Sequence, residues 1–559
     1  MSVSVPPQRT ANPRRRGNGG VGPVLASALV GWCALAWGIA AKDGRYGGWA
    51  MASVLLGVAA TGLAVARHRP VPAPPHPSGR LPAAASPPGR GGPADGARPV
   101  TPDRHRSVMH HLRSVARRLP GSAWPLAALT LGLGPIVRHP RYYACGPLAV
   151  LADTLAIAAG LLAAAAIIVA TAGPTGRSAR LPRSAVPGRA PWARLGESAG
   201  LFWVVLGLAC AAGIATVRAA PEPRIDVFHL LQVSAAGLPH GADMYRQQWA
   251  PSRAEYGVRG LFDVYPYLPW TSVLLAPFRL LLGDVRYGLL AALALAAACT
   301  RRLMGAARPG ASGRGAGMAA AVLPLLVVIF PESMYALQQS WTEPLLVACL
   351  AVAVLAARGG RGWVALVAFA LALAAKQHVV LLLPVAAAWP AFGVRRAAGA
   401  AGLAALLVAP WVLAGPRDFV DDAIWTNLHY QVLAESLSVP GWAAHFGLAL
   451  GFGPALVALV AAYAAAWRAR GDAAGFCLGA ALVTATAALM NKQTFFNHYT
   501  LPMGLLVLAA AALAAAPSEH GNGNGQGERD GGGAREVPAP PPADGPQRSV
   551  ENRSSDAPS

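Results

Sequence analysis

The sequence predicts an all-α protein that crosses a lipid bilayer many times, and three observations support that prediction. Of its 559 residues, 54% are hydrophobic and only 13% are charged, whereas about a quarter of the residues of a soluble domain are charged. Apolar runs recur from Val21 to Ala516, many of them near the roughly 20 residues that a helix needs to cross the hydrocarbon core. The arginines gather in short loops and linkers beside these runs, as the positive-inside rule expects of cytoplasmic loops.

The net charge of +22 would suggest a nucleic-acid partner in a soluble protein. Here the arginines are better explained as signals of membrane topology, so we expect membrane lipid and no nucleic acid among the partners. The six cysteines are scattered, five of them inside apolar segments. Their spacing predicts neither a disulfide framework nor a metal site.

The chain begins with a basic tail and a hairpin of two apolar runs, over residues 1–66. The first run follows Arg14, Arg15 and Arg16 and imitates a signal peptide, but its length and the second run close behind it favour an uncleaved anchor. Residues 67–120 are dense in Pro, Gly and Arg and predict a disordered cytoplasmic linker. A second helix pair and a basic loop occupy 121–198.

The dense helical module lies at 199–516, and the Gly- and Asn-rich tail at 517–559 is again predicted to be disordered. Counting apolar runs gives about fourteen crossings, with both termini in the cytoplasm and the protein in the plasma membrane. The predicted crossings are 21–41, 48–66, 122–137, 146–171, 199–217, 284–300, 316–330, 342–357, 362–375, 378–393, 397–414, 445–467, 473–490 and 501–516.

The segment 268–282 is the one apolar run that this topology does not count as a crossing. It is short and contains Pro277 and Arg279, which suits a juxtamembrane or re-entrant helix. Counting it as a span would place every later arginine-rich loop on the outer side. The resulting topology puts 218–266, 331–343, 376–378, 415–440 and 491–500 on the outer face, where we expect a chemical site.

The first of these outer loops places a carboxylate just beyond a spanning helix, at Asp226. A carboxylate at that depth can take a proton from an attacking hydroxyl. Asp226 can equally pair with Arg224 or Arg218, or cap a short helix. Both interpretations remain open from spacing alone.

The lysines are informative because the chain otherwise uses arginine, with lysine only at positions 42, 376 and 492. Lys376 interrupts a long apolar stretch, and Lys492 follows the end of another apolar run. Ionisable groups at such positions are candidates for function, and a compact ammonium suits a phosphate oxygen. The alternative is that each side chain extends to the membrane surface without a ligand.

Glu343 stands where an apolar run begins, so capping of a helix N-terminus explains it well. Tyr245, Tyr265, Gln377, His498 and Tyr499 lie in or beside the predicted outer loops. There they can contact a substrate or belong to the aromatic residues found at membrane interfaces.

The order of these motifs resembles the GT-C superfamily of membrane glycosyltransferases, most of all the polyprenol-phosphate-mannose-dependent mannosyltransferases of actinobacteria. Three outer-loop segments carry the resemblance: Arg224-Ile225-Asp226-Val227-Phe228, then Gly241-Ala242-Asp243-Met244-Tyr245, then Tyr265-Pro266-Tyr267-Leu268-Pro269. The pairs Trp341-Thr342-Glu343-Pro344 and Ala374-Ala375-Lys376-Gln377 are similar to the superfamily's helix pair that ends in lysine, and Asn497-His498-Tyr499-Thr500 to its terminal-helix entry.

The resemblance covers 199–516 and departs from the family pattern at two places. Phe228 and His229 stand where a tyrosine is common, and the second proline of the aromatic motif is displaced to Pro269. The first four helices match no part of the family pattern.

The resemblance implies transfer of a hexose or pentose, mannose among them, from a polyprenyl-phosphate donor to a glycolipid or glycan of the cell envelope. Asp226 would be the base and Lys376, with Arg224 or Lys492, would bind the donor phosphate. Tyr245, Tyr265, Glu343, Gln377, His498 and Tyr499 would contact substrate, with no metal and no cofactor beyond the lipid-linked sugar. A transporter or flippase of lipid-linked sugars and a non-catalytic membrane protein of envelope assembly are the alternatives.

Overall fold

Helices are the only regular secondary structure in the described chain. The computed structural model describes residues 21–40, 46–70, 123–137, 143–171, 199–247, 264–305, 321–329 and 333–515. In these ranges 81% of residues are helical and none is in a strand, which confirms the predicted all-α class. The linker and tail predicted to be disordered at 67–120 and 517–559 lie outside the described residues, apart from 67–70, and so does the basic loop after residue 171.

Eight helices are long and apolar enough to cross a membrane. They overlap eight of the predicted crossings, although fourteen are not shown. With the bounds of the whole helices, they are α1 (Val21–Ala40), α2 (Gly48–Arg67), α4 (Gly146–Thr171), α6 (Ala199–Ala219), α9 (Arg286–Gly305), α15 (Gly393–Ala414), α19 (Phe452–Ala469) and α21 (Asn497–Ala514).

Shorter helices fill the space between these spans. They are Ala123–Val137, α8 (Trp270–Leu282), α11 (Ser333–Gln338), α12 (Glu343–Arg358), α13 (Gly362–Ala375), α14 (Leu383–Ala388) and α20 (Ala473–Leu489). The bounds of α13 match the prediction, and those of α20 differ from it by one residue. The helix α8 has 13 residues, about 20 Å of rise, and α13 has 14, so length alone does not separate the predicted juxtamembrane helix from a predicted crossing.

Three predicted crossings differ from the observed elements. The predicted span 378–393 is divided into a 3-10 helix, η4 (Gln377–Leu382), and the short α14, because Pro384 and Pro390 cannot donate backbone hydrogen bonds. The span predicted from 445 begins at Phe452, after Gly447 turns the chain with φ of 70°. The described part of 316–330 contains a 3-10 helix, η3 (Leu323–Val327).

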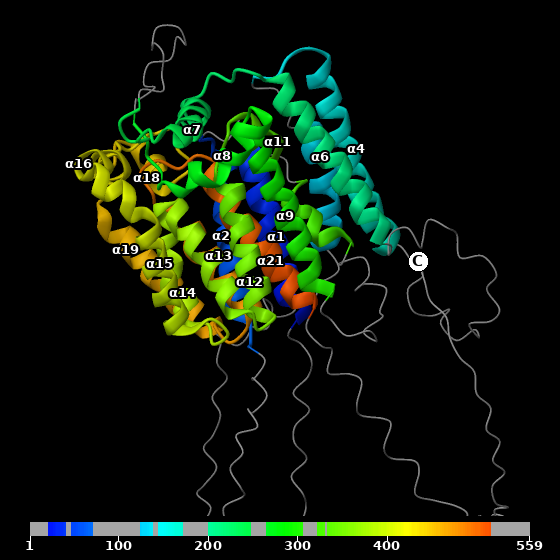
Figure 1. Cartoon of the computed structure of the whole chain (residues 1–559). Helices are drawn as coiled ribbons and strands as arrows, with labels where there is room; N and C mark the ends of the chain where they lie inside the picture. Colours follow the sequence, from blue (N-terminus) through cyan, green and yellow to red (C-terminus); the bar gives the residue numbers. More distant parts are fainter. Residues whose placement is uncertain are drawn as a thin grey trace, which may run out of the picture. The chain divides into compact units, whose positions relative to one another are not determined.

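The hairpin of α1 and α2 packs into the bundle. Figure 1 shows both blue helices beside the orange and red end of the chain, and α1 packs on α21 while α2 packs on α19 and α20. The hairpin closes tightly at Gly57, where a side chain would lie 2.7 Å from Leu35 Cγ. The first and last described spans therefore form one packed unit.

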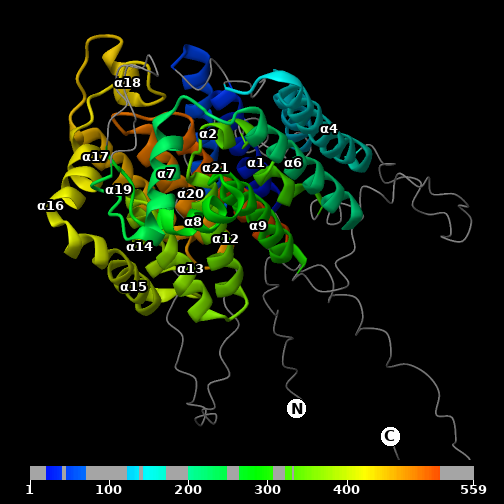
Figure 2. The same cartoon turned by 45° about the horizontal axis from the view of Figure 1, so that its top comes forward.

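The polar segments gather at one end of the bundle. Figure 1 shows α7 (Asp226–Gly237), α8, α11 and α18 (Val439–Ala444) at its upper end. Figure 2 turns this end forward and shows α16 (Pro416–Phe419) and α17 (Thr426–His429) at its edge. A π-helix, η5 (Val420–Trp425), joins α16 to α17. All ten side chains predicted to form the site belong to segments of this end.

Candidate functional site

Asp226 is the first residue of α7, on a short segment that follows α6. Ile225 before it is extended, and Asp226 Oδ1 accepts a hydrogen bond of 2.8 Å from the backbone N–H of Val227. The cap position of α7 is held by Ile225, and no side chain caps the helix there, so Asp226 is not the N-cap. Burial raises the pKa of Asp226 above its ordinary value, more than backbone hydrogen bonds lower it. A raised pKa makes the carboxylate a stronger base.

Tyr267 lies within electrostatic reach of two carboxylates. Its pKa is raised well above the ordinary value, first by burial and then by the negative charges of Glu343 and Asp226. The pKa of Tyr430 is raised by burial and then by Asp226. Both tyrosines therefore lie close enough to Asp226 for its charge to raise their pKa values.

Lys376 is buried where α13 ends. Its Nζ donates to Glu343 Oε1 at 2.5 Å and to Thr342 Oγ1 at 3.1 Å, and lies 5.2 Å from the ring centre of Tyr267. The side chain is only 9% exposed, so it does not extend to the surface. An ammonium has three protons to donate, and two have partners among the described residues. The third is available to a ligand oxygen.

The start of α21 adds an amide and an imidazole to this group. Asn497 Nδ2 donates to Glu343 Oε1 at 3.4 Å, and His498 lies in the electrostatic field of both Lys376 and Glu343. His378, two residues after Lys376, also lies in the field of that lysine and of His498. The structure therefore brings together Glu343 and Lys376, with His498 close to both. Asp226 is related to this group through Tyr267, whose pKa responds to both Asp226 and Glu343.

Two buried acceptor atoms in this group have no hydrogen-bond partner in the described part of the chain: Glu343 Oε2 and Asn497 Oδ1. In the turn just before Glu343, three further buried polar atoms have no hydrogen-bond partner among the described residues: Gln338 Nε2, Gln339 Nε2 and Ser340 Oγ. Leaving a buried polar atom unpaired costs about 1–3 kcal/mol. Such a concentration is typical of a site that is completed by water or by a polar ligand.

Three of the predicted substrate residues instead fix the Tyr265–Leu268 segment. The hydroxyl of Tyr245 donates to Tyr267 O at 2.9 Å, and Gln377 Nε2 donates to Pro266 O at 3.0 Å. The hydroxyl of Tyr265 lies 2.7 Å from Ser272 Oγ. These contacts hold Tyr267 in place, so in this conformation the three residues position the site.

The remaining predicted residues lie apart from the group. Tyr499 is completely buried and donates to Leu437 O at 2.7 Å, which anchors α21. Lys492 is exposed and donates to Leu428 O at 3.1 Å. Arg224 is exposed, and its backbone carbonyl accepts from the hydroxyl of Tyr143 at 2.8 Å. No contact between either cation and Lys376 occurs in the described residues.

Sequence reasoning did not select Tyr267, Thr342 or Asn497 as site residues. Each is a direct neighbour of a selected position or of a quoted motif: Tyr267 is in the aromatic segment, Thr342 precedes Glu343, and Asn497 precedes His498. The feature of the sequence that could have identified these three residues is their position, since each is a polar residue at the end of an apolar run. Which of several adjacent polar residues faces Lys376 depends on helix rotation, which spacing alone does not give.

The arrangement offers one carboxylate of raised pKa and one buried ammonium, joined by a tyrosine that interacts with both. It can accept a proton at Asp226 and bind an anion at Lys376. Among the described residues there is no group of three His, Cys, Asp or Glu side chains placed to hold a metal ion.

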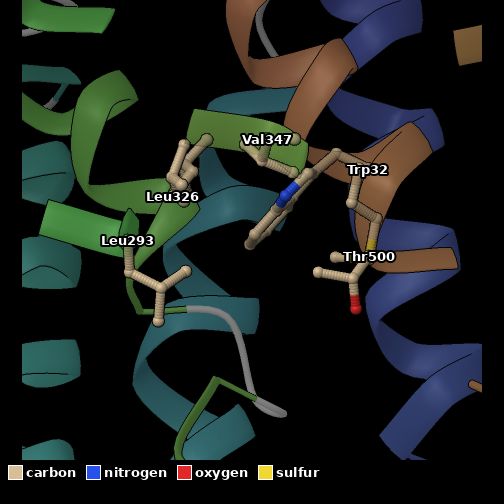
Figure 3. Close-up of a pocket in the computed structure, with 8 residues that line it drawn as sticks. Trp32, Leu293, Leu326, Val347 and Thr500 are labelled. Atoms are coloured by element: carbon tan, nitrogen blue, oxygen red, sulfur yellow. The ribbon is translucent and has the colours of Figure 1, made fainter. Parts of the chain in front are cut away.

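A small cavity occurs elsewhere, inside the bundle (Figure 3). It is lined by Trp32 of α1, Leu293 of α9, Leu326 of η3 and residues of α12 and α21. Its walls are almost entirely apolar, with Thr500 contributing the only hydroxyl of the lining residues. It marks where α1 meets the later helices and offers no charged group for chemistry.

The chain matches no known family model, no curated protein and no solved structure.

Proposed function

We propose that the protein is an inverting membrane glycosyltransferase. It takes a sugar, mannose or another hexose or pentose, from a polyprenyl-phosphate donor and transfers it to a glycolipid or glycan of the cell envelope. The observation that carries the proposal is the buried Lys376–Glu343 pair beside the ring of Tyr267, a tyrosine whose pKa is also raised by the charge of Asp226. A base and an anion-binding cation at one place are the two groups that this reaction requires.

In the proposed reaction Asp226 takes the proton of an acceptor hydroxyl. The hydroxyl oxygen forms a bond to the anomeric carbon as the bond from that carbon to the phosphate oxygen breaks. The electron pair leaves with the polyprenyl phosphate, so no acid is needed to protonate the leaving group. Lys376 stabilises the charge that develops on the phosphate, and this stabilisation is greatest in the transition state.

The unpartnered atoms beside Lys376 suit a sugar. A sugar hydroxyl both donates and accepts hydrogen bonds, so it can satisfy the acceptors Glu343 Oε2 and Asn497 Oδ1 as well as the amide donors of Gln338 and Gln339. A phosphate alone offers only acceptors and would leave Glu343 Oε2 unpaired. We therefore place the sugar on the Glu343 side of Lys376.

We further propose about fourteen crossings in the plasma membrane, with the site on the extracytoplasmic face. Six further crossings would join the eight longer spans. They are the helices Ala123–Val137, α12, α13 and α20, the segment 316–330, and η4 together with α14. The outer segment between Pro416 and Glu435 contains one arginine, Arg417, and no lysine, which supports this sidedness.

The test is transfer of radiolabelled sugar from polyprenyl-phosphate mannose in membranes that contain the wild type or Asp226→Asn at matched expression. We expect the wild type to transfer label and the variant to lose at least about 100-fold of that activity, because a positioned base contributes about 10²–10⁴-fold. Asp421→Asn, an exposed carboxylate of η5, is the matched control and should retain full transfer.

Equal transfer by wild type and Asp226→Asn would remove Asp226 from the role of base. Absence of transfer by the wild type with a panel of polyprenyl-phosphate sugars would contradict the donor class. Movement of a lipid-linked sugar across reconstituted vesicles without a new glycosidic bond would instead establish the flippase alternative.

A further inference from the structure

The turn between α8 and α9 ends at Arg286, the first residue of α9, which is completely buried and contacts the chain on both sides of Asp226. Arg286 Nη2 donates to Val217 O at 3.3 Å, at the end of α6. The same guanidinium lies over the ring of Phe228, 4.7 Å from its centre, in the first turn of α7. We propose that Arg286 is the positioning residue that fixes the 217–228 segment and thereby aims Asp226 at the site. This inference rests on the proposed function.

Arg286 does not act as a counter-ion to Asp226, because its charge is compensated within its own turn. Asp284 accepts from Nε at 3.0 Å on both carboxylate oxygens and from Nη2 at 2.6 Å on Oδ2. A forked arrangement of this kind fixes the plane of the guanidinium. The plane then offers one face to Phe228 and one edge to Val217.

Helix geometry explains how this contact directs Asp226. Phe228 and Gln232 are four residues apart and so lie on the same face of α7. That face meets the turn twice, because Gln232 Oε1 accepts from the backbone N–H of Val285 at 3.3 Å. At about 100° per residue, Asp226 lies roughly 200° around the helix from Phe228. Holding the Phe228 face against the turn therefore directs Asp226 to the opposite side, toward Tyr267 and Tyr430.

The far end of α7 has a separate anchor. Ser234 Oγ lies 2.6 Å from Ser272 Oγ, which in turn lies 2.7 Å from the hydroxyl of Tyr265. A change at Arg286 should therefore loosen the start of α7, where Asp226 lies, and leave its end attached to α8. This makes a folded variant with a misplaced carboxylate the expected result.

The first experiment compares the wild type with Arg286→Lys, which keeps the positive charge beside Asp284 and loses the planar contacts. We expect kcat to fall about 10- to 100-fold, the range typical of a small misplacement of a reacting group, with the KM for the donor changed by less than about threefold. Phe228→Leu should change kcat in the same direction. Arg302→Lys, the same substitution at an exposed position of α9, is the control.

The pH profile separates a positioning role from a loss of folded protein. Burial raises the pKa of Asp226, so kcat/KM should fall on acidification at a higher pH than for an ordinary carboxyl group. Loosening α7 lets water reach Asp226, lowers its pKa and moves this acid limb to lower pH in Arg286→Lys. The titratable groups facing Asp226 are Tyr267 and Tyr430, which stay neutral on this limb because their pKa values are raised. Glu222, Arg224 and His229 lie nearby on its own segment. A smaller amount of folded enzyme would lower the amplitude and leave the limb in place, and that result would overturn the proposal.

A labelling experiment tests the positioning independently of transferase activity. Asp226→Cys is placed in a Cys145→Ser background, because Cys145 is the exposed native cysteine among the described residues. The rate at which the introduced cysteine at position 226 reacts with a membrane-impermeant maleimide is then measured with and without Arg286→Lys. We expect at least about a threefold faster reaction when Arg286 is replaced. Equal rates would overturn the positioning role even if transfer is established, and a faster rate would support it even if the donor class is wrong.

Discussion

The ammonium of Lys376 and the carboxylate of Glu343 form a pair whose side chains are 9% and 1% exposed. From the sequence, Glu343 is explained as a helix cap because an apolar run begins there. In the structure its Oε1 instead accepts hydrogen bonds from Lys376 and Asn497. A buried pair of this kind contributes little stability relative to apolar residues, but removing one partner leaves an uncompensated charge. Stability and function can therefore be separated at this site.

Lys376→Met should lower the free energy of unfolding by about 3–5 kcal/mol because it leaves Glu343 charged and buried. The double variant Lys376→Met with Glu343→Gln removes both charges and should recover most of that loss. Neither variant should transfer sugar, since neither has a cation for the phosphate. Thermal unfolding in detergent, followed beside transfer assays, measures both effects. Recovery of transfer in the double variant would mean that Lys376 serves the fold alone.

At the scale of elements, small residues decide how closely the helices approach. Without a hydrophobic driving force between helices in lipid, close backbone contact at small residues supports association. Gly160 of α4 is an example, because a side chain there would lie 2.3 Å from the backbone oxygen of Leu131, in the helix Ala123–Val137. That oxygen belongs to the backbone and cannot move aside as a side chain would.

Gly160→Ala should therefore destabilise the contact between α4 and the helix before it, by about 1–3 kcal/mol as for other overpacked sites. Gly207 of α6 has no atom within 4 Å of an added side chain, so Gly207→Ala is the matched control. It should be neutral or stabilise by up to about 1 kcal/mol through helix propensity. The measurement is the unfolding midpoint of each variant in the same detergent, which should be lower for Gly160→Ala than for Gly207→Ala. Equal midpoints would show that α4 can shift to accept a methyl group.

At the scale of the whole molecule, the N-terminal hairpin belongs to the packed bundle and is not an appendage of the 199–516 module. Trp32 of α1 is 1% exposed and lines the internal cavity with residues of α9, η3, α12 and α21 (Figure 3). His68, just after α2, lies 3.0 Å from Asp472 at the start of α20. Both contacts join segments that are hundreds of residues apart in the sequence.

Deleting residues 1–120 should therefore prevent folding, although every residue of the candidate site remains in the chain. The deletion exposes the α1-facing side of α21, whose first residues are Asn497 and His498. We expect loss of a monodisperse peak in size-exclusion chromatography and loss of transfer. Co-expression of residues 1–70 as a separate chain should restore at least part of both. A monodisperse and active 121–559 chain would show that the hairpin is dispensable.

The sequence by itself determined the membrane class and the position of most helices. Long apolar runs in a membrane protein form helices, because lipid offers no hydrogen-bond partner for backbone N–H and C=O groups. For the same reason the apolar run 362–375 predicts a helix with the bounds that α13 has in the structure. The breaks inside 377–388 and before Phe452 depend on Pro384, Pro390 and Gly447, whose signals were present but were outweighed by hydropathy.

Tertiary structure alone decided which polar groups meet. From the sequence, four charged residues at the ends of apolar runs are candidates for the site: Asp226, Lys376, Arg224 and Lys492. Packing then buried Lys376 against Glu343, 33 positions away, and left Arg224 and Lys492 exposed. Hydropathy places a residue along the membrane normal but does not fix the rotation of a helix or its neighbours. Those depend on side-chain packing among helices distant in sequence, as in the contact of Arg286 with Val217 and Phe228.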